Sequence, residues 1–444
     1  MARTKDRQIQ VVVLMGGRGT RLGDSHLDTP KSMVDIYGRP FFWYQLQLMK
    51  YYGLRNFIFC VGYKAELIKS FFKDGCRFGV NIRYSFDGKE LLGTGGALKK
   101  AEPFLEKDFM VIYADSYMDV DYREIVSVYY EVKKEQGKKA LLTIFKNKNR
   151  YDKSNVIFKN NRLLKYDKIN TSEEMEYIDY GISILDKGVL AGIPRNKYFD
   201  LSNLYSILVK DGLMAGYEVR NRFYEIGRPS SLKEFKKFIY QRAFVKKPAV
   251  ILDRDGTLNA LCLNEETGQL DSPLKPNDLK LLPKTIDALR IIKSLGYTII
   301  VITNQPQAAK GKITLAKLYR INNELKDILA KNRIFMDDYL ICPHHPLGSI
   351  YTKDQFLIKD CKCRKPKPGL FKIAREKFNL DIPNSYVVGD SYVDILAGKA
   401  VKMKTVFLGE YKCDACQLLK GHRPDYVFKN LYEFAIFLRK RKIT

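Results

Sequence analysis

Short apolar runs alternate with amphipathic stretches along the first half of the chain. Runs typical of buried strands occupy residues 10–15, 56–61 and 109–113, and apolar positions with helical spacing occupy residues 41–52, 65–72 and 96–105. Regular alternation of this kind is typical of an α/β fold in which helices cover a parallel sheet. We therefore expect such a sheet in the N-terminal half.

The same alternation starts afresh after residue 248. Its strand-like and helical stretches are residues 249–252, 285–295, 298–303 and 315–330, with further strands near Tyr339, Tyr386 and Thr405. An amphipathic helical pattern at 231–245 precedes the polar, proline-marked joint at 246–248. The sequence thus predicts two Rossmann-like α/β domains, at residues 1–245 and 246–444.

Composition agrees with two folded domains. The chain has 444 residues, of which 45% are hydrophobic and 29% charged, and this excludes disordered and disulfide-stapled classes. It has no apolar run long enough for a membrane helix, and its first ten residues lack the apolar core of a signal peptide. We expect a cytoplasmic location, no membrane partner, and eight Cys that are reduced thiols or metal ligands.

The net charge of +27 would attract phosphate-bearing partners, whether nucleic acid or small phosphorylated metabolites. The lysines are spread along the chain rather than gathered in blocks, so we expect no nucleic-acid partner. A basic regulatory or nucleic-acid-binding protein built on degenerate enzyme domains is the alternative outside enzymes. Oligomeric state is not fixed by the sequence.

A glycine-rich turn follows the first strand and is a candidate phosphate-binding loop. Glycines at the end of a strand let backbone N–H groups approach phosphate oxygens, and nearby cations offset phosphate charge. A second glycine-rich segment opens a helix at residues 92–97, and the strand at 109–113 ends near a carboxylate suited to Mg²⁺. The candidate residues are Gly16, Gly17, Gly19, Thr20, Arg21, Lys31, Gly93, Thr94, Gly95 and Asp115.

These motifs, in this order, resemble the sugar-1-phosphate nucleotidyltransferase family over about residues 8–240, especially the mannose- and heptose-1-phosphate guanylyltransferases. The resemblance implies a nucleotidyltransferase α/β sandwich in which the first loop and Lys31 hold the nucleoside triphosphate and Asp115 holds Mg²⁺. It also implies Lys168 as a ligand of the sugar phosphate and Gly181 as a ligand of the sugar. Glu225 stands where the family commonly has a metal-binding Asp, and a surface carboxylate is the alternative interpretation.

The implied reaction is attack by a sugar-1-phosphate oxygen on the α-phosphorus of the triphosphate, with release of pyrophosphate. Mg²⁺, Arg21 and Lys31 would offset charge in the transition state while the loops align the reactants. The reaction requires no nucleophilic side chain.

Two aspartates, Asp253 and Asp255, follow the first strand of the C-terminal half, where period-two geometry directs both side chains toward one region. With Thr303, Lys365 and Asp390 they resemble the haloacid dehalogenase (HAD)-type phosphatases. The resemblance implies that Asp253 forms an aspartyl-phosphate and that Asp255 is the acid and base. It further implies that Thr303 and Lys365 bind the phosphoryl group. Mg²⁺ would lie between Asp253, the backbone carbonyl of Asp255, and Asp390.

Three cysteines and one histidine gather just before Lys365. Cys342, His344, Cys361 and Cys363 form a Cys₃His set suited to structural Zn²⁺, which would order the long loop between them. Free thiols are the alternative interpretation. We take His345 as a non-ligand and assign no function to Cys413 and Cys416.

The cysteine motif together with the DRDGT sequence resembles the heptose-1,7-bisphosphate 7-phosphatases over about residues 248–435, and histidinol phosphatases share much of the pattern. The resemblance implies substrate contacts for Arg364, and we place Asn304 in the substrate site with it. Removal of the distal phosphate from a sugar 1,7-bisphosphate leaves the sugar 1-phosphate that a nucleotidyltransferase needs. The expected function is therefore a bifunctional enzyme that makes GDP-D-glycero-α-D-manno-heptose from heptose 1,7-bisphosphate, through heptose 1-phosphate, and GTP.

One alternative keeps both reaction types but changes the sugar or the nucleoside triphosphate. A mannose-type nucleotidyltransferase fused to a sugar-phosphate or histidinol-phosphate-type phosphatase would be an example.

Overall fold

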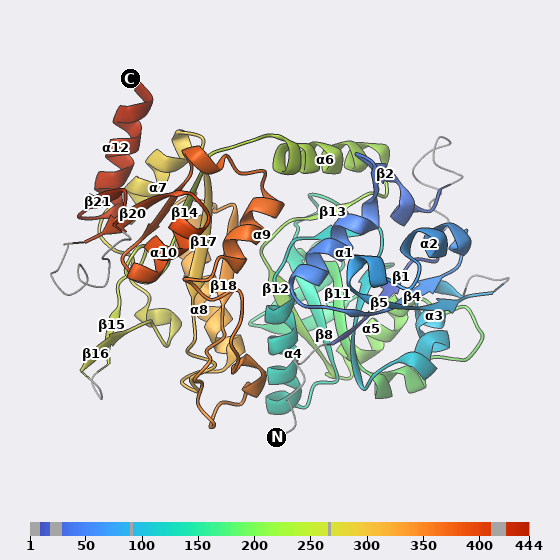
Figure 1. Ribbon diagram of the computed structural model, residues 1–444. Helices are drawn as coiled ribbons and strands as arrows, with labels where there is room; N and C mark the ends of the chain where they lie inside the picture. The colour runs from blue at the N-terminus through green and yellow to red at the C-terminus, as the bar shows by residue number, and fades with distance from the viewer. Residues whose placement is uncertain (1–8, 18–28, 89–91, 265–267, 410–422, 444) are drawn as a thin grey trace. The chain divides into compact units, whose positions relative to one another are not determined.

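The computed structural model describes residues 9–17, 29–88, 92–264, 268–409 and 423–443 (Figure 1). The chain divides into two compact units, the first ending at Phe238 and the second beginning at Ile239. The domain limits at residues 245 and 246 stay a prediction.

The first unit is built on a mixed sheet. The main path of the sheet runs β10-β9-β11-β6-β1-β4-β5, with β8 beside β11 and β12 beside β8. These nine described strands are β1 (Gln10–Leu14), β4 (Asn56–Val61), β5 (Asn81–Phe86), β6 (Asp108–Tyr113), β8 (Ala140–Lys146), β9 (Val156–Lys159), β10 (Arg162–Tyr166), β11 (Tyr177–Asp186) and β12 (Met214–Val219).

Only part of this sheet is parallel. Strands β6, β1, β4 and β5 are parallel, whereas β11 runs antiparallel to both β6 and β8. The expectation of a parallel sheet is therefore confirmed for the three predicted strands, β1, β4 and β6, and the antiparallel part is formed by strands that the sequence analysis did not predict. No helix is described between β8 and β11, and strands joined without a crossover helix pair antiparallel.

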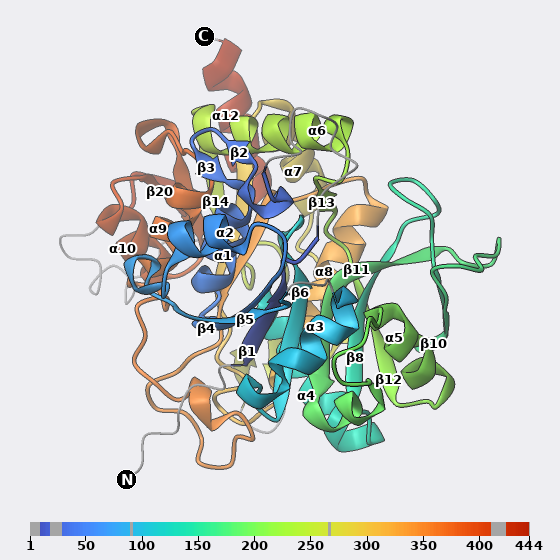
Figure 2. The ribbon, with the colours of Figure 1, turned by 90° about the vertical axis from the view of Figure 1, so that its right-hand side faces the viewer.

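Helices cover both faces of the parallel part. Phe42 of α1 (Phe41–Tyr51) and Phe72 of α2 (Ala65–Phe72) each contact Phe59 of β4, with ring centroids 5.5 Å apart in both pairs. On the other face, α3 (Gly93–Ala101) and α5 (Leu201–Lys210) bury Leu98 and Leu204 in the cluster that contains Val12 (Figure 2). Burial on both faces explains why β1 is apolar at nearly every position.

Two further helices follow in the first unit: α4 (Tyr122–Gln136) and α6 (Pro229–Ile239). Helix α6 continues as a π-helix over Tyr240–Phe244, and together they match the helical pattern expected at 231–245.

The second unit has a parallel sheet with the order β18-β17-β14-β19-β20-β21, in which β14 is an inner strand. The six described strands are β14 (Ala249–Leu252), β17 (Thr298–Asn304), β18 (Asp338–Cys342), β19 (Tyr386–Gly389), β20 (Lys404–Leu408) and β21 (Tyr426–Phe428). All seven expected positions of strands and helices from 249 to 405 are confirmed to within a few residues. A small hairpin, β15 (Cys262–Asn264) and β16 (Gln269–Asp271), follows β14.

Helices α7 (Thr285–Ser294), α8 (Leu315–Lys331) and α12 (Leu431–Ile443) share one hydrophobic cluster with β14 residues Val250 and Leu252. Helices α9 (Gly369–Lys377) and α10 (Tyr392–Ala400) pack against β17, β18, β19 and β20. In a parallel sheet packed between helices, side chains that follow the carboxyl ends of the strands can form a site there.

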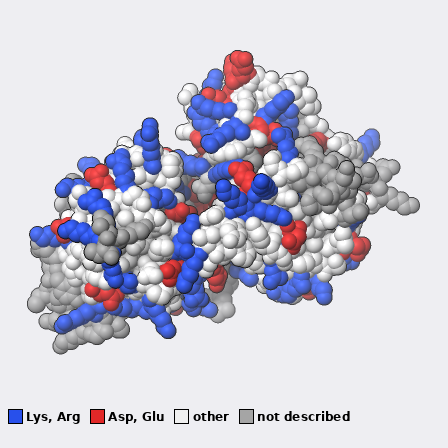
Figure 3. All heavy atoms as spheres, turned by 90° about the horizontal axis from the view of Figure 1, so that it is seen from above, with Lys and Arg blue, Asp and Glu red and all other residues white. Residues whose placement is uncertain are grey.

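Lysine and arginine side chains are spread over the face seen in Figure 3, with acidic side chains among them. The absence of a nucleic-acid partner stays a prediction. Among the helices of the described residues, none combines the length and apolarity needed to cross a membrane.

Candidate active sites

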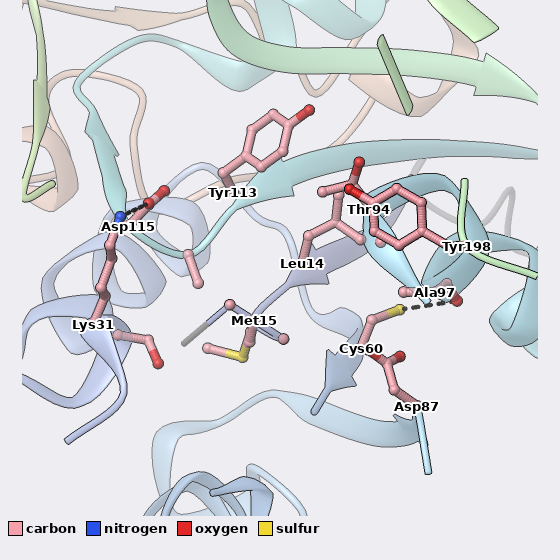
Figure 4. A pocket seen from close by; sticks show the side chains of 15 residues that line it. Leu14, Met15, Lys31, Cys60, Asp87, Thr94, Ala97, Tyr113, Asp115 and Tyr198 are labelled. Atoms are coloured by element: carbon pink, nitrogen blue, oxygen red, sulfur yellow. Dashed lines mark hydrogen bonds and ion pairs between the residues drawn. The ribbon is translucent and has the colours of Figure 1, made fainter. Parts of the chain in front are cut away.

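A cavity of about 340 Å³ opens at the carboxyl ends of β1 and β6 in the first unit (Figure 4). Six residues expected at the nucleotide site line it: Gly16, Gly17, Lys31, Gly93, Thr94 and Asp115. Lys31 lies on a short 3-10 helix (Lys31–Met33), and its Nζ donates a hydrogen bond of 3.0 Å to Oδ2 of Asp115. A cation and a carboxylate thus lie together at one end of the cavity. The cation suits a phosphate group, and the carboxylate suits the metal ion that accompanies the phosphate.

The glycine-rich segment that opens α3 lies against residues 199–201. The Gly95 N–H donates to the Phe199 carbonyl at 2.8 Å, and the Leu201 N–H donates to Thr94 Oγ1 at 2.8 Å. Gly93 has a φ of +71°, and a Cβ there would lie 2.8 Å from the Phe199 oxygen, so only glycine fits. Gly95 is not among the residues that line the cavity, and its contacts are those of packing.

Glu225 lies beside Asp115 although the two residues are far apart in sequence. It ends β13 (Phe223–Glu225), which pairs with β7 (Ser116–Met118), and the Ile226 N–H donates to the Asp115 carbonyl at 3.1 Å. A Cβ on Gly227 would lie 2.5 Å from Glu225 Oε1 and 3.8 Å from Lys31 Nζ. The strand pairing therefore brings Glu225 near Asp115 and Lys31. Among the described residues, Glu225 lines a second cavity with Tyr224 and Arg228 rather than the one that Lys31 and Asp115 line. Carboxylate oxygens are the donors that Mg²⁺ prefers.

The two residues expected at the sugar lie next to Tyr113, whose ring forms part of the cavity wall. The Lys168 Nζ lies 5.7 Å from the centroid of the Tyr113 ring. Gly181 has a φ of +100°, and a Cβ there would approach Met118 Sδ to 3.3 Å and Tyr113 Cδ2 to 3.8 Å. Gly19, Thr20 and Arg21 lie outside the described residues.

In the second unit, Asp253 follows β14 and meets the buried Lys365. The Lys365 Nζ lies 2.9 Å from Asp253 Oδ1 and 2.6 Å from Asp394 Oδ1, and its side chain is 1% exposed. Burial alone would lower the pKa of Lys365, but the two carboxylates outweigh burial and raise it. The lysine is therefore a fixed positive charge beside the predicted nucleophile.

The position of Lys365 is fixed by the neighbouring strand. Its N–H donates to Asn304 Oδ1 at 2.9 Å, Asn304 Nδ2 donates to its carbonyl at 3.1 Å, and Nζ donates to the Ile302 carbonyl at 2.8 Å. Asn304 ends β17, and Thr303 beside it is buried. Asn304 thus positions the lysine, a role that its assignment to the substrate site did not include.

Asp255 is held by groups that the sequence analysis did not assign. The fully buried Arg254 donates to both Asp255 oxygens, at 2.8 and 2.9 Å, and its Nη1 donates to Asn322 Oδ1. Gln305 Nε2 donates to Asp255 Oδ2 at 2.7 Å, and Asn259 Nδ2 donates to Oδ1 at 2.9 Å. Arg254 lies between Asp253 and Asp255, and Gln305 lies two residues after Thr303. Their places within these motifs are the sequence signal that could have identified them as site residues.

Asp253, Asp390 and Asp394 each offer a carboxylate oxygen within 4.8 Å of the others. Burial, together with the neighbouring carboxylates, raises the pKa of Asp390 to about 6 and that of Asp394 to about 7. A divalent cation would offset this repulsion, and hard carboxylate oxygens fit Mg²⁺. Asp394 also forms an ion pair with Lys365, and this contact suits a residue that supports the metal ligands Asp253 and Asp390 without binding the metal itself.

Cys342, His344, Cys361 and Cys363 form a second group whose donor atoms lie within 4.8 Å of one another. The three Sγ–Sγ separations are 3.6, 3.4 and 3.2 Å, and His344 Nδ1 lies 3.2 Å from Cys363 Sγ. Tetrahedral Zn–S bonds of about 2.3 Å would separate two sulfurs by roughly 3.7 Å, so the group is close to that geometry. His345 Nδ1 instead accepts the Leu347 N–H at 3.1 Å, and Arg364 Nη1 donates to the His344 carbonyl at 3.3 Å.

Comparison with known proteins covers both units. A family model described as nucleotidyl transferase matches residues 10–241, which is more than half of the 444 residues. The chain is 35% identical over 161 residues to D-glycero-beta-D-manno-heptose-1,7-bisphosphate 7-phosphatase of Escherichia coli O6:H1, covering 36% of this chain and 78% of that protein. The chain belongs to the nucleotidyl transferase family and to the heptose-1,7-bisphosphate 7-phosphatase family.

Two further matches lie within the 7-phosphatase half. The D-glycero-alpha-D-manno-heptose-1,7-bisphosphate 7-phosphatase of Photorhabdus laumondii is 36% identical over 163 residues, covering 37% of this chain and 82% of that protein. A family model described as HAD-hydrolase-like matches residues 362–434.

Among solved structures, HddC from Yersinia pseudotuberculosis complexed with GMP-PN is 24% identical, covering 52% of this chain and 100% of that chain with a TM-score of 0.44. The two family memberships make the chain a bifunctional enzyme with a transferase half and a phosphatase half.

Proposed function

We propose that the two halves catalyse consecutive steps of heptose nucleotide-sugar synthesis. The phosphatase half converts heptose 1,7-bisphosphate to heptose 1-phosphate. The transferase half then joins this product to the GMP part of GTP, giving GDP-D-glycero-α-D-manno-heptose and pyrophosphate. The observation that carries the proposal is the union, in one chain, of a 7-phosphatase with a nucleotidyltransferase, whose acceptor is the kind of product that the phosphatase makes.

In the phosphatase half, Asp253 attacks the phosphorus at C7 and Asp255 protonates the leaving sugar oxygen. Asp255 then removes a proton from the water that hydrolyses the aspartyl-phosphate. Lys365 and Thr303 hold the phosphoryl oxygens, and Arg364 contacts the sugar. Asp253, Asp390 and the Asp255 carbonyl would hold Mg²⁺, which supplies positive charge to the phosphoryl oxygens when bound.

In the transferase half, Gly16, Gly17 and Lys31 bind the triphosphate, with Gly19, Thr20 and Arg21 completing the loop. Asp115 and Glu225 would hold Mg²⁺ next to Lys31. Lys168 and Gly181 receive the sugar phosphate beside Tyr113, so that its oxygen can reach the α-phosphorus in line.

The Cys₃His group would hold a structural Zn²⁺. Its last ligand, Cys363, stands two residues before Lys365, so the ion would order the segment that delivers the lysine to Asp253.

The full chain with Mg²⁺ tests the proposal when it is given the α and β anomers of heptose 1,7-bisphosphate, with each nucleoside triphosphate in turn. We expect phosphate release followed by a GDP-heptose, both identified by mass. Asp253→Asn should give no nucleotide sugar from the bisphosphate but should still give it from heptose 1-phosphate. Phosphate release without use of any nucleoside triphosphate would contradict the transferase half of the proposal, and no phosphate release from either anomer would contradict the phosphatase half.

A further inference from the structure

The second cavity of the transferase half has a volume of about 290 Å³, and of its residues only Glu225 has a part in the proposed chemistry. Two stretches of chain line it: residues 150–152, between β8 and β9, and residues from 222 to 234, which run through β13 into α6. Its charged side chains are Arg150, Arg222, Arg228, Asp152, Glu225 and Glu234. Three positive charges therefore meet three negative ones, and the lining has no net charge.

Arg222 is held in one orientation within this lining. Its Nη1 and Nη2 donate to the two carboxylate oxygens of Glu234, at 2.5 and 2.6 Å. Its guanidinium carbon lies 4.3 Å from the ring centroid of Tyr151 and 4.6 Å from that of Tyr224. Side chains fixed in this way lose little conformational entropy when a ligand binds, so the Arg222–Glu234 pair is ready to form hydrogen bonds with one.

The charges of the cavity do not favour an anion. Glu234 offsets Arg222, and Asp152 Oδ1 lies 3.8 Å from Arg228 Nη2. A hydroxyl group suits such pairs better, because it can donate to a carboxylate and accept from a guanidinium at the same time. Three aromatic side chains also line the cavity and can cover the C–H groups of a carbon chain. We therefore expect a neutral ligand whose neighbouring carbons carry hydroxyls.

The cavity borders both the metal site and the strand expected at the sugar. Gly227 lines it, and a Cβ there would lie 3.8 Å from Lys31 Nζ. The Phe223 ring, also in the lining, lies 5.7 Å from the ring of Tyr180, which precedes Gly181. In the pyranose form of a sugar 1-phosphate, C5 is joined to C1 through the ring oxygen alone. The carbons attached to C5 therefore lie beside the phosphate and can enter the cavity when the phosphate is bound at the metal site.

We propose that this cavity binds the two-carbon tail, C6 and C7, of the acceptor and so selects heptose 1-phosphate over hexose 1-phosphates. A heptose carries two neighbouring hydroxyls on this tail, whereas a hexose has a single carbon and a single hydroxyl there. The heptose hydroxyls donate to Glu234 and accept from Arg222, and the tail carbons lie against the aromatic rings. The inference rests on the proposed function, since it assumes that the transferase half uses a sugar 1-phosphate as acceptor.

The test compares heptose 1-phosphate with mannose 1-phosphate, which has the same ring but lacks C7, using GTP, Mg²⁺ and the full chain. In the wild type, kcat/KM for the heptose should exceed that for mannose by about 10-fold to 100-fold, the effect of one or two hydrogen bonds to charged groups. Arg222→Met should lower the heptose value by about 10-fold or more, through the KM for the sugar, so that the preference approaches one. The values for mannose 1-phosphate and the KM for GTP should stay unchanged.

Arg162→Met is the matched control, because Arg162 is an exposed arginine on β10 that is not part of the cavity lining. It should keep the wild-type preference. No preference for the heptose in the wild type, or an unchanged ratio in an active Arg222→Met enzyme, would overturn the inference and leave the proposed function intact. If Arg222→Met is inactive with both sugars, Glu234→Gln, which keeps the size of the pair, decides by the same ratio. A wild-type enzyme that makes no nucleotide sugar from heptose 1-phosphate overturns both proposals.

Discussion

The Lys365 ammonium lies 2.9 Å from Oδ1 of Asp253, the predicted nucleophile of the phosphatase half. Two hydrogen bonds between Asn304 and the backbone of Lys365 hold the lysine segment at the end of β17. The Lys365–Asp253 pair therefore depends on the ends of β14 and β17 and on the segment that contains Lys365.

Replacement of Lys365 by methionine should abolish most phosphate release and leave nucleotide-sugar formation from heptose 1-phosphate intact. The lysine offsets charge on the transferring phosphoryl group, and loss of one such interaction costs about 10²-fold to 10³-fold in kcat. Phosphate and pyrophosphate release by the same protein measure the two halves. Lys367→Met is the matched control, because Lys367 is half-exposed two residues away; an equal loss in both variants would contradict a specific role for Lys365.

Replacement of Gly256 by alanine should also disable the phosphatase half, through Asp390. Gly256 has a φ of +77°, and a Cβ there would lie 2.0 Å from Asp390 Oδ2, so the predicted metal ligand would have to move. Gly268→Ala has the same left-handed backbone, with a φ of +65°, but nothing within 4 Å of the added Cβ. Gly268→Ala should therefore show only the backbone cost of about 1–2 kcal/mol.

The Mg²⁺ concentration that gives half-maximal phosphate release should rise in Gly256→Ala and stay unchanged in Gly268→Ala. Equal Mg²⁺ dependence in the two variants would show that Asp390 is not a ligand.

Replacement of Cys363 by serine should remove the bound zinc and weaken the phosphatase. Serine cannot replace the thiolate as a zinc ligand near neutral pH, and without the ion the segment before Lys365 loses its cross-link. Metal analysis of the purified chain should find about one zinc in the wild type and none in the variant. Cys262→Ser, outside the group, should keep both the zinc and the activity; zinc that stays bound in Cys363→Ser would contradict the assignment.

Replacement of Glu225 by glutamine should raise the Mg²⁺ requirement of the transferase half alone. Glu225 lies beside Asp115 and Lys31, and its neutral analogue has a weaker attraction for a divalent cation. Pyrophosphate release as a function of Mg²⁺ concentration measures the change. Glu174→Gln, at an exposed position in the same unit, is the control; identical Mg²⁺ curves for the two variants would favour the surface interpretation of Glu225.

The sequence by itself determined the local chemistry of this protein. Apolar runs such as residues 56–61 and 249–252 became strands at those positions, because strands buried on both faces need continuous apolar sequence. The glycine and aspartate motifs at the strand ends predicted sites for phosphate and a cation, and their resemblance to two enzyme families implied the two reaction types.

Only the tertiary structure decided which distant groups meet. The mixed sheet arose because β11 pairs antiparallel with both β6 and β8, and the apolar pattern alone does not distinguish antiparallel strands from parallel ones. Glu225 reached Asp115 through the pairing of β13 with β7, and Arg254 and Gln305 converged on Asp255. Asp87 carries no motif of its own. It lines the cavity of the first unit because β5 lies two strands from β1, and burial there raises its pKa.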